Sequence, residues 1–526
     1  MKGSVDKYFV FILLAGLAVF GANIWGLSVY MLDEAKNASC AAEMLQRGDW
    51  VVPTFNGELR TDKPPFHYYL MMLAFTLGGV NPLTARIFQS LAGVFLMGYV
   101  YQYVKRKAGV KTAIITALVL CSSFQLHVQF HLAVPDPFLI IWLTVTLLSF
   151  YDFYEGNTKA WKWIFIGAGF GFLTKGPVAL VLPAGVAIIF LLLTSNLNLA
   201  FIRRMKLLQG IALFLLAALP WYVAVGLKTD GAWLKGFFLQ HNIGRFTDTM
   251  EGHRGYFILP PVVLLLSLFP FSLFAFAAIR QAWRGKGLPL FATCVVITIT
   301  LFFMLSKTFL PGYVSPAIPF LSIVLGNYLS EHFQWSRSWM WTVPVAVLFG
   351  LLITGALLFG LKEEGSEFSG LHNLNLLTLI LPVALGVAGY FLSSKNLQAA
   401  FISTVTGWIA FSLVVFYFIA PVIDRNNPVR MSENIRRLYH DYTPVAYGLF
   451  NPAFVFEYKS VIPRFNDVKS LRKYIEEHPR SLILARSSAV DEIRAAGEFK
   501  VVFQQRDLFE KSETVILVPL LNPESR

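Results

Sequence analysis

The chain has 526 residues, of which 56% are hydrophobic and only 14% are charged. Together with a mean hydropathy of +0.58, this composition excludes a soluble globular protein and predicts many membrane-spanning helices. The formal net charge of +13 could suggest a nucleic-acid partner, but the basic residues form short clusters between apolar runs, as topology signals do. The three cysteines are too far apart to indicate a disulfide framework or a zinc site.

The first apolar run, Tyr8–Tyr30, follows Lys2 and Lys7. It is too long for the core of a signal peptide, so we expect an uncleaved first span with a cytoplasmic N-terminus. The next apolar run, 66–80, is too short to cross a bilayer and is expected to be an interfacial or re-entrant helix. Assigning the basic clusters to the cytoplasmic side then leaves about 13 spans and an external C-terminus.

The polar stretch Asp33–Pro65 lies between these two runs. We expect Asp33 to cap a helix from Glu34 to Arg47 that ends at Gly48. Small residues would give this helix a face for close packing on the bundle. A helix cap alone would explain an isolated aspartate.

The same stretch also concentrates charge. Glu34 adjoins Asp33, and Lys63 precedes the rigid pair Pro64-Pro65. This combination favours a functional loop over a simple helix cap. The two adjacent acids could also hold a divalent cation with bound phosphate, although no cofactor follows from the sequence.

Two polar residues mark the external ends of later spans. Asp136, followed by Pro137, begins the run 134–154, which is also an ordinary helix start. Lys175 interrupts the runs 161–174 and 176–195. A lysine at this depth could extend its amine to the membrane surface or bind a phosphate, and the sequence leaves both interpretations open.

Two external loops complete the candidate site. The loop 228–255 contains His241, Asn242, Arg245 and His253, which suit an anionic head group or sugar hydroxyls because arginine binds phosphate bidentately. The two histidines lack the paired spacing of a zinc site. A short turn further on carries Lys307 and Tyr313, and the tyrosine could face the cavity or belong to the interfacial aromatic belt.

The composition changes beyond Ile423, where the apolar runs end. Residues 424–526 are predicted to form a small external α/β domain, and residues 1–423 the membrane domain. Helices are expected at Ser432–His440, Asp467–His478 and Ala489–Ala496. Strands are expected at Val445–Phe450, Phe454–Tyr458, Ser481–Ala485, Val501–Gln504 and Thr514–Leu520.

The sequence has no P-loop, no dinucleotide-binding glycine motif and no G-x-S-x-G elbow. Acids and phosphate-binding cations on the external face, where nucleotide sugars are scarce, therefore suggest a sugar donor carried on a lipid phosphate. An alternative is a transporter or flippase of lipid-linked sugars, which would place polar groups at the bilayer midplane. A third, a non-catalytic subunit of envelope assembly, would leave the ordered acids and lysines unexplained.

Six motifs follow one another in a characteristic order: DE, EMLQRGDWVVPTFNGELRTDKPPFHYYL, PDPFLIIWLTVTLLSFY, GFLTKGPVALVLP, FFLQHNIGRF and SKTFLPGYVSPAIPFL. In this the chain resembles the bacterial aminoarabinose (lipid A) transferases and the protein O-mannosyltransferases. The resemblance implies a GT-C fold: a polytopic helical bundle, juxtamembrane helices in the first external loop and a soluble periplasmic C-terminal domain. It also implies inverting transfer of a sugar from a polyprenyl-phosphate donor at the bacterial inner membrane.

The resemblance also implies roles for individual residues. Asp33 would orient or deprotonate the acceptor, and Lys63 would hold the donor phosphate. The full expected site has catalytic, donor-phosphate and acceptor or sugar groups, respectively: Asp33, Glu34 and Asp136; Lys63, Lys175, Arg245, Lys307 and Tyr313; His241, Asn242 and His253.

The chain also departs from the family pattern. It has Lys36-Asn37 where relatives often have Arg-Tyr, and Phe309–Tyr313 reads FLPGY where they often have KLPHY. The acceptor therefore stays open between lipid A, another envelope glycan and a protein.

Overall fold

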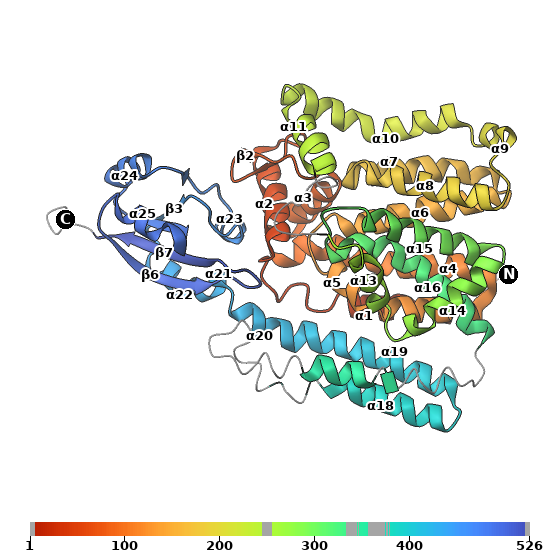
Figure 1. The fold of residues 1–526 in the computed structure, drawn as a ribbon. Helices are drawn as coiled ribbons and strands as arrows, with labels where there is room; N and C mark the ends of the chain where they lie inside the picture. The colour runs from red at the N-terminus through yellow and green to blue at the C-terminus, as the bar shows by residue number, and fades with distance from the viewer. Residues whose placement is uncertain are drawn as a thin grey trace.

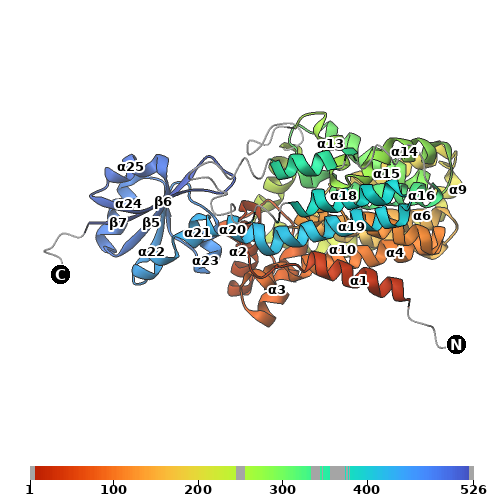
Figure 2. The same cartoon turned by 90° about the horizontal axis from the view of Figure 1, so that it is seen from below.

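The computed structural model describes residues 6–244, 255–332, 344–345, 347–355, 374, 377 and 379–520. A bundle of long helices occupies most of the molecule, and a β-sheet lies at one end of it (Figures 1 and 2). The N-terminus lies at the opposite end of the bundle from the sheet.

Five helices within the described part of the chain are long and apolar enough to cross a membrane: Pro82–Cys121 (α4), Asp136–Tyr154 (α6), Leu207–Lys228 (α10), Pro311–Glu331 (η4 with α16) and Leu397–Arg425 (α19, η6 and α20). A sixth is counted if Leu259–Ser267 (α13) and Phe271–Arg284 (η3 with α14), which are bent by 118°, form one span. Shorter apolar helices include Lys7–Phe20 (α1), Phe66–Gly78 (α3), Val178–Leu193 (α8), Leu288–Met304 (α15) and Ile380–Ser393 (α18). The larger number of spans expected from the sequence stays a prediction.

Helix α4 combines two of the expected apolar runs. It leaves helical geometry at Gly109, where φ is 86°. Glycine adopts such a positive φ without steric cost. The second run then stops at Cys121, and Ser123 caps a separate short helix, Phe124–Phe130 (α5), by accepting a hydrogen bond from the backbone N–H of Leu126. The apolar run 112–132 of the sequence is therefore not one continuous helix.

The segment between α1 and α3 contains the helix Leu32–Arg47 (α2) and a small hairpin, Thr54–Phe55 (β1) and Glu58–Leu59 (β2). The predicted stop is confirmed, because Gly48 has a left-handed φ of 64°. The predicted cap is wrong: α2 begins two residues earlier than expected, so Met31 is the cap residue and Asp33 lies in the first turn. The short helix α3 was expected as an interfacial helix and is present at Phe66–Gly78.

The hairpin is attached to α2 through one carboxylate. Glu43 accepts hydrogen bonds from the Thr54 hydroxyl at 2.6 Å and from the backbone N–H groups of Asn56 and Gly57 at 2.6 and 3.2 Å. Both turn residues have positive φ angles, as a tight two-residue hairpin requires. This arrangement fixes the chain that leads from α2 toward Lys63.

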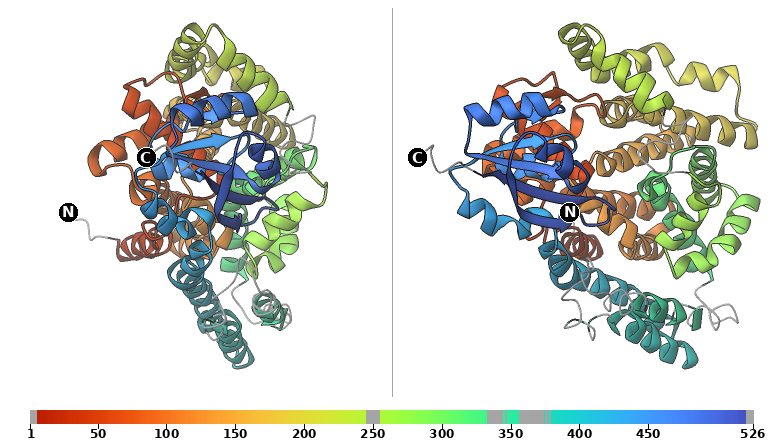
Figure 3. Two further views of the ribbon diagram at one scale, coloured as in Figure 1. Left: turned by 90° about the vertical axis from the view of Figure 1, so that its left-hand side faces the viewer. Right: turned by 60° about the vertical axis from the view of Figure 1, so that its left-hand side comes forward.

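The C-terminal sheet has the strand order β4-β3-β5-β7-β6. Its strands are Thr443–Tyr447 (β3), Arg464–Phe465 (β4), Ser481–Arg486 (β5), Phe499–Arg506 (β6) and Glu513–Pro519 (β7). Strand β3 runs parallel to β4 and β5, while β7 is antiparallel to β5 and β6. Figure 3 shows this sheet in front of the helical bundle. Four of the five expected strands are thus present, and β4 was missed.

Helices cover both faces of the sheet. Val468–Glu477 (α24) and Val490–Arg494 (α25) pack on one face. The helix Ala453–Tyr458 (α23) lies between the other face and α2. Its sequence was predicted to be a strand, which is wrong. The run is buried from several sides, and a short apolar run of that kind has no periodicity that separates strand from helix.

Candidate functional site

A cavity of about 480 Å³ lies where the loop before α3, the start of α6, the turn between α7 and α8, and the segments η2 and η4 meet. Here α7 is Trp161–Lys175, and η2 is a π-helical segment, Gly236–Gly244. The polar lining of the cavity comprises Asp62, Lys63, Asp136, Lys175, His241, Asn242, Ser306 and Tyr313. Its apolar lining includes Leu139, Val178, Val181, Leu182, Phe302 and Phe303. Six of the residues expected from the sequence thus share one cavity.

Lys175 and Asp136 form an ion pair in the cavity wall. The Lys175 ammonium donates to Asp136 Oδ1 at 2.6 Å and also lies 5.0 Å from the centre of the Tyr313 ring. Both charged side chains are mostly buried, with 17% and 16% exposed. A carboxylate and an aromatic face are both favourable partners for a lysine ammonium in a site largely shielded from water.

The turn that carries Lys175 depends on Gly176. Its φ is 74° and its ψ is −143°, a region essentially restricted to glycine. A Cβ atom there would lie 2.5 Å from the ring of Phe237. The absence of a side chain therefore lets η2, which carries His241, pack directly against the turn.

Asp62 was not among the residues expected to be functional, yet it lies among the charged side chains of the site. Its Oδ1 lies 3.0 Å from His241 Nε2, and its Oδ2 lies 3.3 Å from Arg60 Nη2. Burial opposes ionisation, but the contact with His241 and the charges of Arg60 and Lys63 together lower the pKa of Asp62 far below its ordinary 3.8. Asp62 is therefore a carboxylate at neutral pH.

Lys63 is nearly inaccessible, with 6% of its surface exposed. It lies next to Asp62 in the chain, and its charge contributes to the lowered pKa of that carboxyl. The two prolines that follow, Pro64 and Pro65, restrict the backbone, and α3 begins directly after them at Phe66. Lys63 was among the residues predicted for the site, and Asp62, the acid before it in the same motif, was not.

Asp33 lies in the first turn of α2 and does not line the cavity. Its charge acts on Arg60, which is buried. Burial disfavours the charged guanidinium, but Tyr68, Asp62 and Asp33 all contribute to holding the pKa of Arg60 above its ordinary value. Arg60 therefore links the expected catalytic aspartate electrostatically to Asp62 in the cavity.

Arg60 is held in place by neutral groups as well. It donates to the Tyr68 hydroxyl at 3.2 Å and to Asn37 Oδ1 at 3.1 Å, and its own carbonyl accepts from the Trp233 indole at 2.8 Å. These partners come from α3, α2 and the segment before η2. Two of these partners thus hold the guanidinium, and the third holds the Arg60 backbone.

Glu34 forms a different kind of contact from the one expected. It is 1% exposed, accepts from Arg86 at 2.7 and 2.8 Å, and also accepts from the backbone N–H of Ala133 at 2.9 Å. Ala133 lies three residues before Asp136. Glu34 therefore connects the first turn of α2 to the start of α6 and does not line the cavity.

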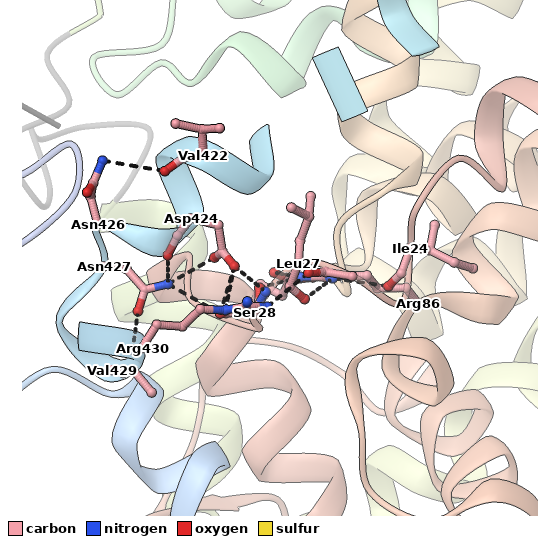
Figure 4. Close-up of polar contacts among 12 residues, drawn as sticks. Ile24, Leu27, Ser28, Arg86, Val422, Asp424, Asn426, Asn427, Val429 and Arg430 are labelled. Atoms are coloured by element: carbon pink, nitrogen blue, oxygen red, sulfur yellow. Dashed lines mark hydrogen bonds and ion pairs between the residues drawn. The ribbon is translucent and has the colours of Figure 1, made fainter. Parts of the chain in front are cut away.

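Arg86 also leads away from the site toward the C-terminal part of the chain. It donates to the carbonyl of Ser28 at 2.7 Å, and the Ser28 hydroxyl donates to Asp424 at 3.0 Å. Asp424 in turn accepts from Asn427 at 2.9 Å and pairs with Arg430 at 2.8 Å. Figure 4 shows these side chains converging on Ser28. A continuous set of polar contacts thus joins the end of the last long helix to Glu34.

The remaining expected residues are placed as follows. Asn242 lines the cavity and donates to the carbonyl of Phe237 at 2.7 Å. Lys307 is exposed and lies beside Ser306 without lining the cavity. Arg245 and His253 lie outside the described residues. Among the residues that the structure describes, no three His, Cys, Asp or Glu side chains are grouped as metal ligands would be.

Comparisons with known proteins agree with this architecture. A family model described as dolichyl-phosphate-mannose-protein mannosyltransferase matches residues 62–223. An uncharacterized protein from Aquifex aeolicus is 27% identical over 92% of both chains. The undecaprenyl phosphate-alpha-4-amino-4-deoxy-L-arabinose arabinosyl transferase of Edwardsiella ictaluri is 28% identical over 58% of this chain, and the match spans 56% of that relative.

Solved structures share the fold. ArnT from Cupriavidus metallidurans, bound to undecaprenyl phosphate, has a TM-score of 0.81 at 20% identity and covers 98% of both chains. The apo oligosaccharyltransferase of Archaeoglobus fulgidus has a TM-score of 0.51 at 12% identity, covering 94% of this chain and 72% of that one.

The fold and the sequence matches together define a membrane glycosyltransferase of the GT-C type. Within that class, the chain resembles the aminoarabinose transferases and the protein O-mannosyltransferases, as its motifs predicted.

Proposed function

We propose that the protein transfers one sugar from a polyprenyl-phosphate donor to an acceptor at the external face of the bacterial inner membrane, with inversion at the anomeric carbon. The observation that carries this proposal is the cavity itself. Two lysines, Lys63 and Lys175, line a cavity whose wall also has a large apolar part. A lipid that ends in a phosphate has an anionic group that the lysines can bind and an apolar chain that the apolar part of the wall can contact.

In the proposed reaction, the acceptor oxygen bonds to the anomeric carbon from the side opposite the phosphate. The bond from that carbon to the phosphate oxygen breaks, and the polyprenyl phosphate leaves with the electron pair. Lys63 and Lys175 stabilise the charge that develops on this phosphate, with Tyr313 beside Lys175.

We assign the acceptor side of the reaction to Asp33, which takes the proton of the acceptor or orients it. Asp136 orients Lys175 through their 2.6 Å contact. We assign Glu34 to support of the site, because both of its oxygens bind Arg86. His241 and Asn242 are placed to contact the sugar, and contacts by Arg245, Lys307 and His253 remain predictions.

We further propose that residues 424–526 form an extracytoplasmic domain and that the N-terminus is cytoplasmic. The acceptor is lipid A, another envelope glycan or a protein. The similarity to the undecaprenyl phosphate-alpha-4-amino-4-deoxy-L-arabinose arabinosyl transferase of Edwardsiella ictaluri supports an aminosugar donor as the first donor to test.

The test is mass spectrometry of lipid A, total glycolipids and envelope proteins from matched strains. The strains carry the wild-type gene, a deletion, Asp33→Asn or the control Asp49→Asn, whose surface carboxylate pairs with Lys228 outside the cavity. We expect one fraction to lose a sugar-sized mass in the deletion and in Asp33→Asn only. If no fraction changes although the wild-type protein is present in the membrane, the proposed transfer is wrong.

A further inference from the structure

Helix α14, Ala275–Arg284, lies at the end of the bundle opposite the sheet (Figures 1 and 2). Arg280 and Arg284 are one helical turn apart and therefore lie on the same side of this helix. Both are exposed. Neither forms an ion pair with any acid in the described ranges. The two guanidinium groups thus offer unneutralised charge at this end of the bundle.

Two hollows flank this arginine pair, and both arginines line each of them. One hollow, of about 350 Å³, is otherwise apolar and is lined by Phe276, Ile279, Trp283 and Ile297. The other, of about 490 Å³, has a polar part formed by Gln281, Tyr328 and His332. The arginines therefore stand between an apolar and a more polar space.

The nearest acid of the neighbouring helix is already hydrogen-bonded elsewhere. Glu331, at the end of α16, accepts from Gln281 at 2.6 Å and from Asn327 at 2.8 Å. Both donors are neutral, and Glu331 forms no ion pair with either arginine in the described part of the chain. The balance of charge at α14 is positive.

We propose that α14 binds an anionic phospholipid of the surrounding membrane, at a site separate from the transfer cavity. Arginine binds phosphate bidentately, so Arg280 and Arg284 would hold the head-group phosphate. An acyl chain would lie in the apolar hollow, against Phe276, which is 79% exposed, and Trp283, which is 45% exposed. Exposed aromatic side chains of this kind are typical of the membrane interface. This inference does not depend on the proposed function.

The test uses the full-length protein purified in detergent and analysed by native mass spectrometry. Phosphatidylglycerol and phosphatidylcholine with identical acyl chains are added separately at equal concentrations. We expect the wild-type protein to retain phosphatidylglycerol in preference. The variant Arg280→Gln/Arg284→Gln should bind it about 30-fold more weakly, since each basic group near an anionic lipid contributes about fivefold in affinity.

The matched control is Lys159→Gln/Lys162→Gln, which removes the same charge from two exposed lysines beside the start of α7. This control should keep the preference, and Trp283→Ala should weaken the retention of both lipids. Equal retention of phosphatidylglycerol by the wild type and the arginine variant would overturn the proposal. Complete displacement of the lipid by millimolar inorganic phosphate would also overturn it, because the site would then bind phosphate without a chain.

Discussion

At the scale of single residues, the cavity places each cation beside an acid. Lys175 contacts Asp136, and Lys63 adjoins Asp62, which in turn contacts Arg60 and His241. Such pairs keep buried charges from being left uncompensated when no phosphate is bound. A phosphate that enters the cavity competes with these carboxylates for the lysines, so donor affinity depends on both members of each pair.

Lys63 gives the most direct prediction. Lys63→Ala should raise the KM for the lipid donor by about 10- to 100-fold, because a hydrogen bond to a charged group contributes about 1.5–3 kcal/mol. Steady-state kinetics with a varied donor concentration measures this. Lys228→Ala removes an exposed lysine that pairs with Asp49, and its KM should equal that of the wild type. An unchanged KM in Lys63→Ala would show that this lysine does not contact the donor.

Asp62 gives a prediction about pH. Because its pKa in the folded protein lies below the ordinary value of 3.8, its carboxylate contributes stability that is fully present above pH 3.8 and is lost as the pH falls below that value. Asp62→Asn should therefore lower the unfolding temperature at pH 7. Thermal unfolding in detergent should show the gap between the variant and the wild type narrowing only in strong acid. A gap that closes already between pH 7 and 5 would contradict this account.

At the scale of elements, two contacts determine how the helices present these residues. The first is the buried pair of Arg86 and Glu34, which joins α4, α2 and the start of α6. The second is the close approach of the turn between α7 and α8 to η2. The first contact connects α2 and α6, which carry proposed site residues, to α4, and the second connects two elements that both carry proposed site residues.

Arg86→Gln should destabilise the protein by about 3–5 kcal/mol, because it leaves Glu34 as an uncompensated buried charge. Arg430→Gln is the comparison at the far end of the same network. Arg430 has 42% of its side chain exposed, so its loss should cost about 1 kcal/mol or less. Chemical denaturation followed by tryptophan fluorescence measures both. Similar losses of stability in the two variants would mean that burial does not determine how much each arginine contributes to stability.

Gly176→Ala tests the second contact. It should lower transfer activity, because a methyl group would meet the Phe237 ring at 2.5 Å and displace η2 from Lys175. Gly231→Ala shares the strain of a positive φ, here 76°, but its added atom meets nothing within 4 Å. Activity per folded enzyme should therefore fall in Gly176→Ala and be retained in Gly231→Ala. Equal activity in Gly176→Ala and Gly231→Ala would show that close packing of Gly176 against Phe237 is not needed for transfer.

At the scale of the whole molecule, the sequence predicted what local patterns determine. The end of α2 at Gly48, the break at Lys175 and most strands of the C-terminal sheet follow from glycine, charge and alternation. The shared cavity was anticipated for Asp136, Lys175, His241 and Asn242 through the family resemblance. Long-range partners were not predictable: His241 with Asp62, and Arg86 with Glu34, are far apart in the chain and carry no local signal.

The same distinction explains the errors. The residues of α23 are apolar because they fill the space between the sheet and α2, so their composition reflects burial and does not reveal their conformation. Asp33 was assigned a capping role from its type and position, but the helix begins two residues earlier, at Leu32. In both cases tertiary packing decided what local preference left open.

The apolar face of α2 has a consequence for the order in which this protein matures. Ala38, Ala41 and Met44 share one core with Phe454 and Ile516, which are separated from them by more than four hundred residues. A ribosome delivers α2 to the membrane long before it synthesises the segment that covers it. The helix that carries Asp33 therefore stays incompletely packed until β7 has been translated. Catalytic competence would then be acquired late in biosynthesis, so a prematurely terminated chain would be inserted in the membrane without being active.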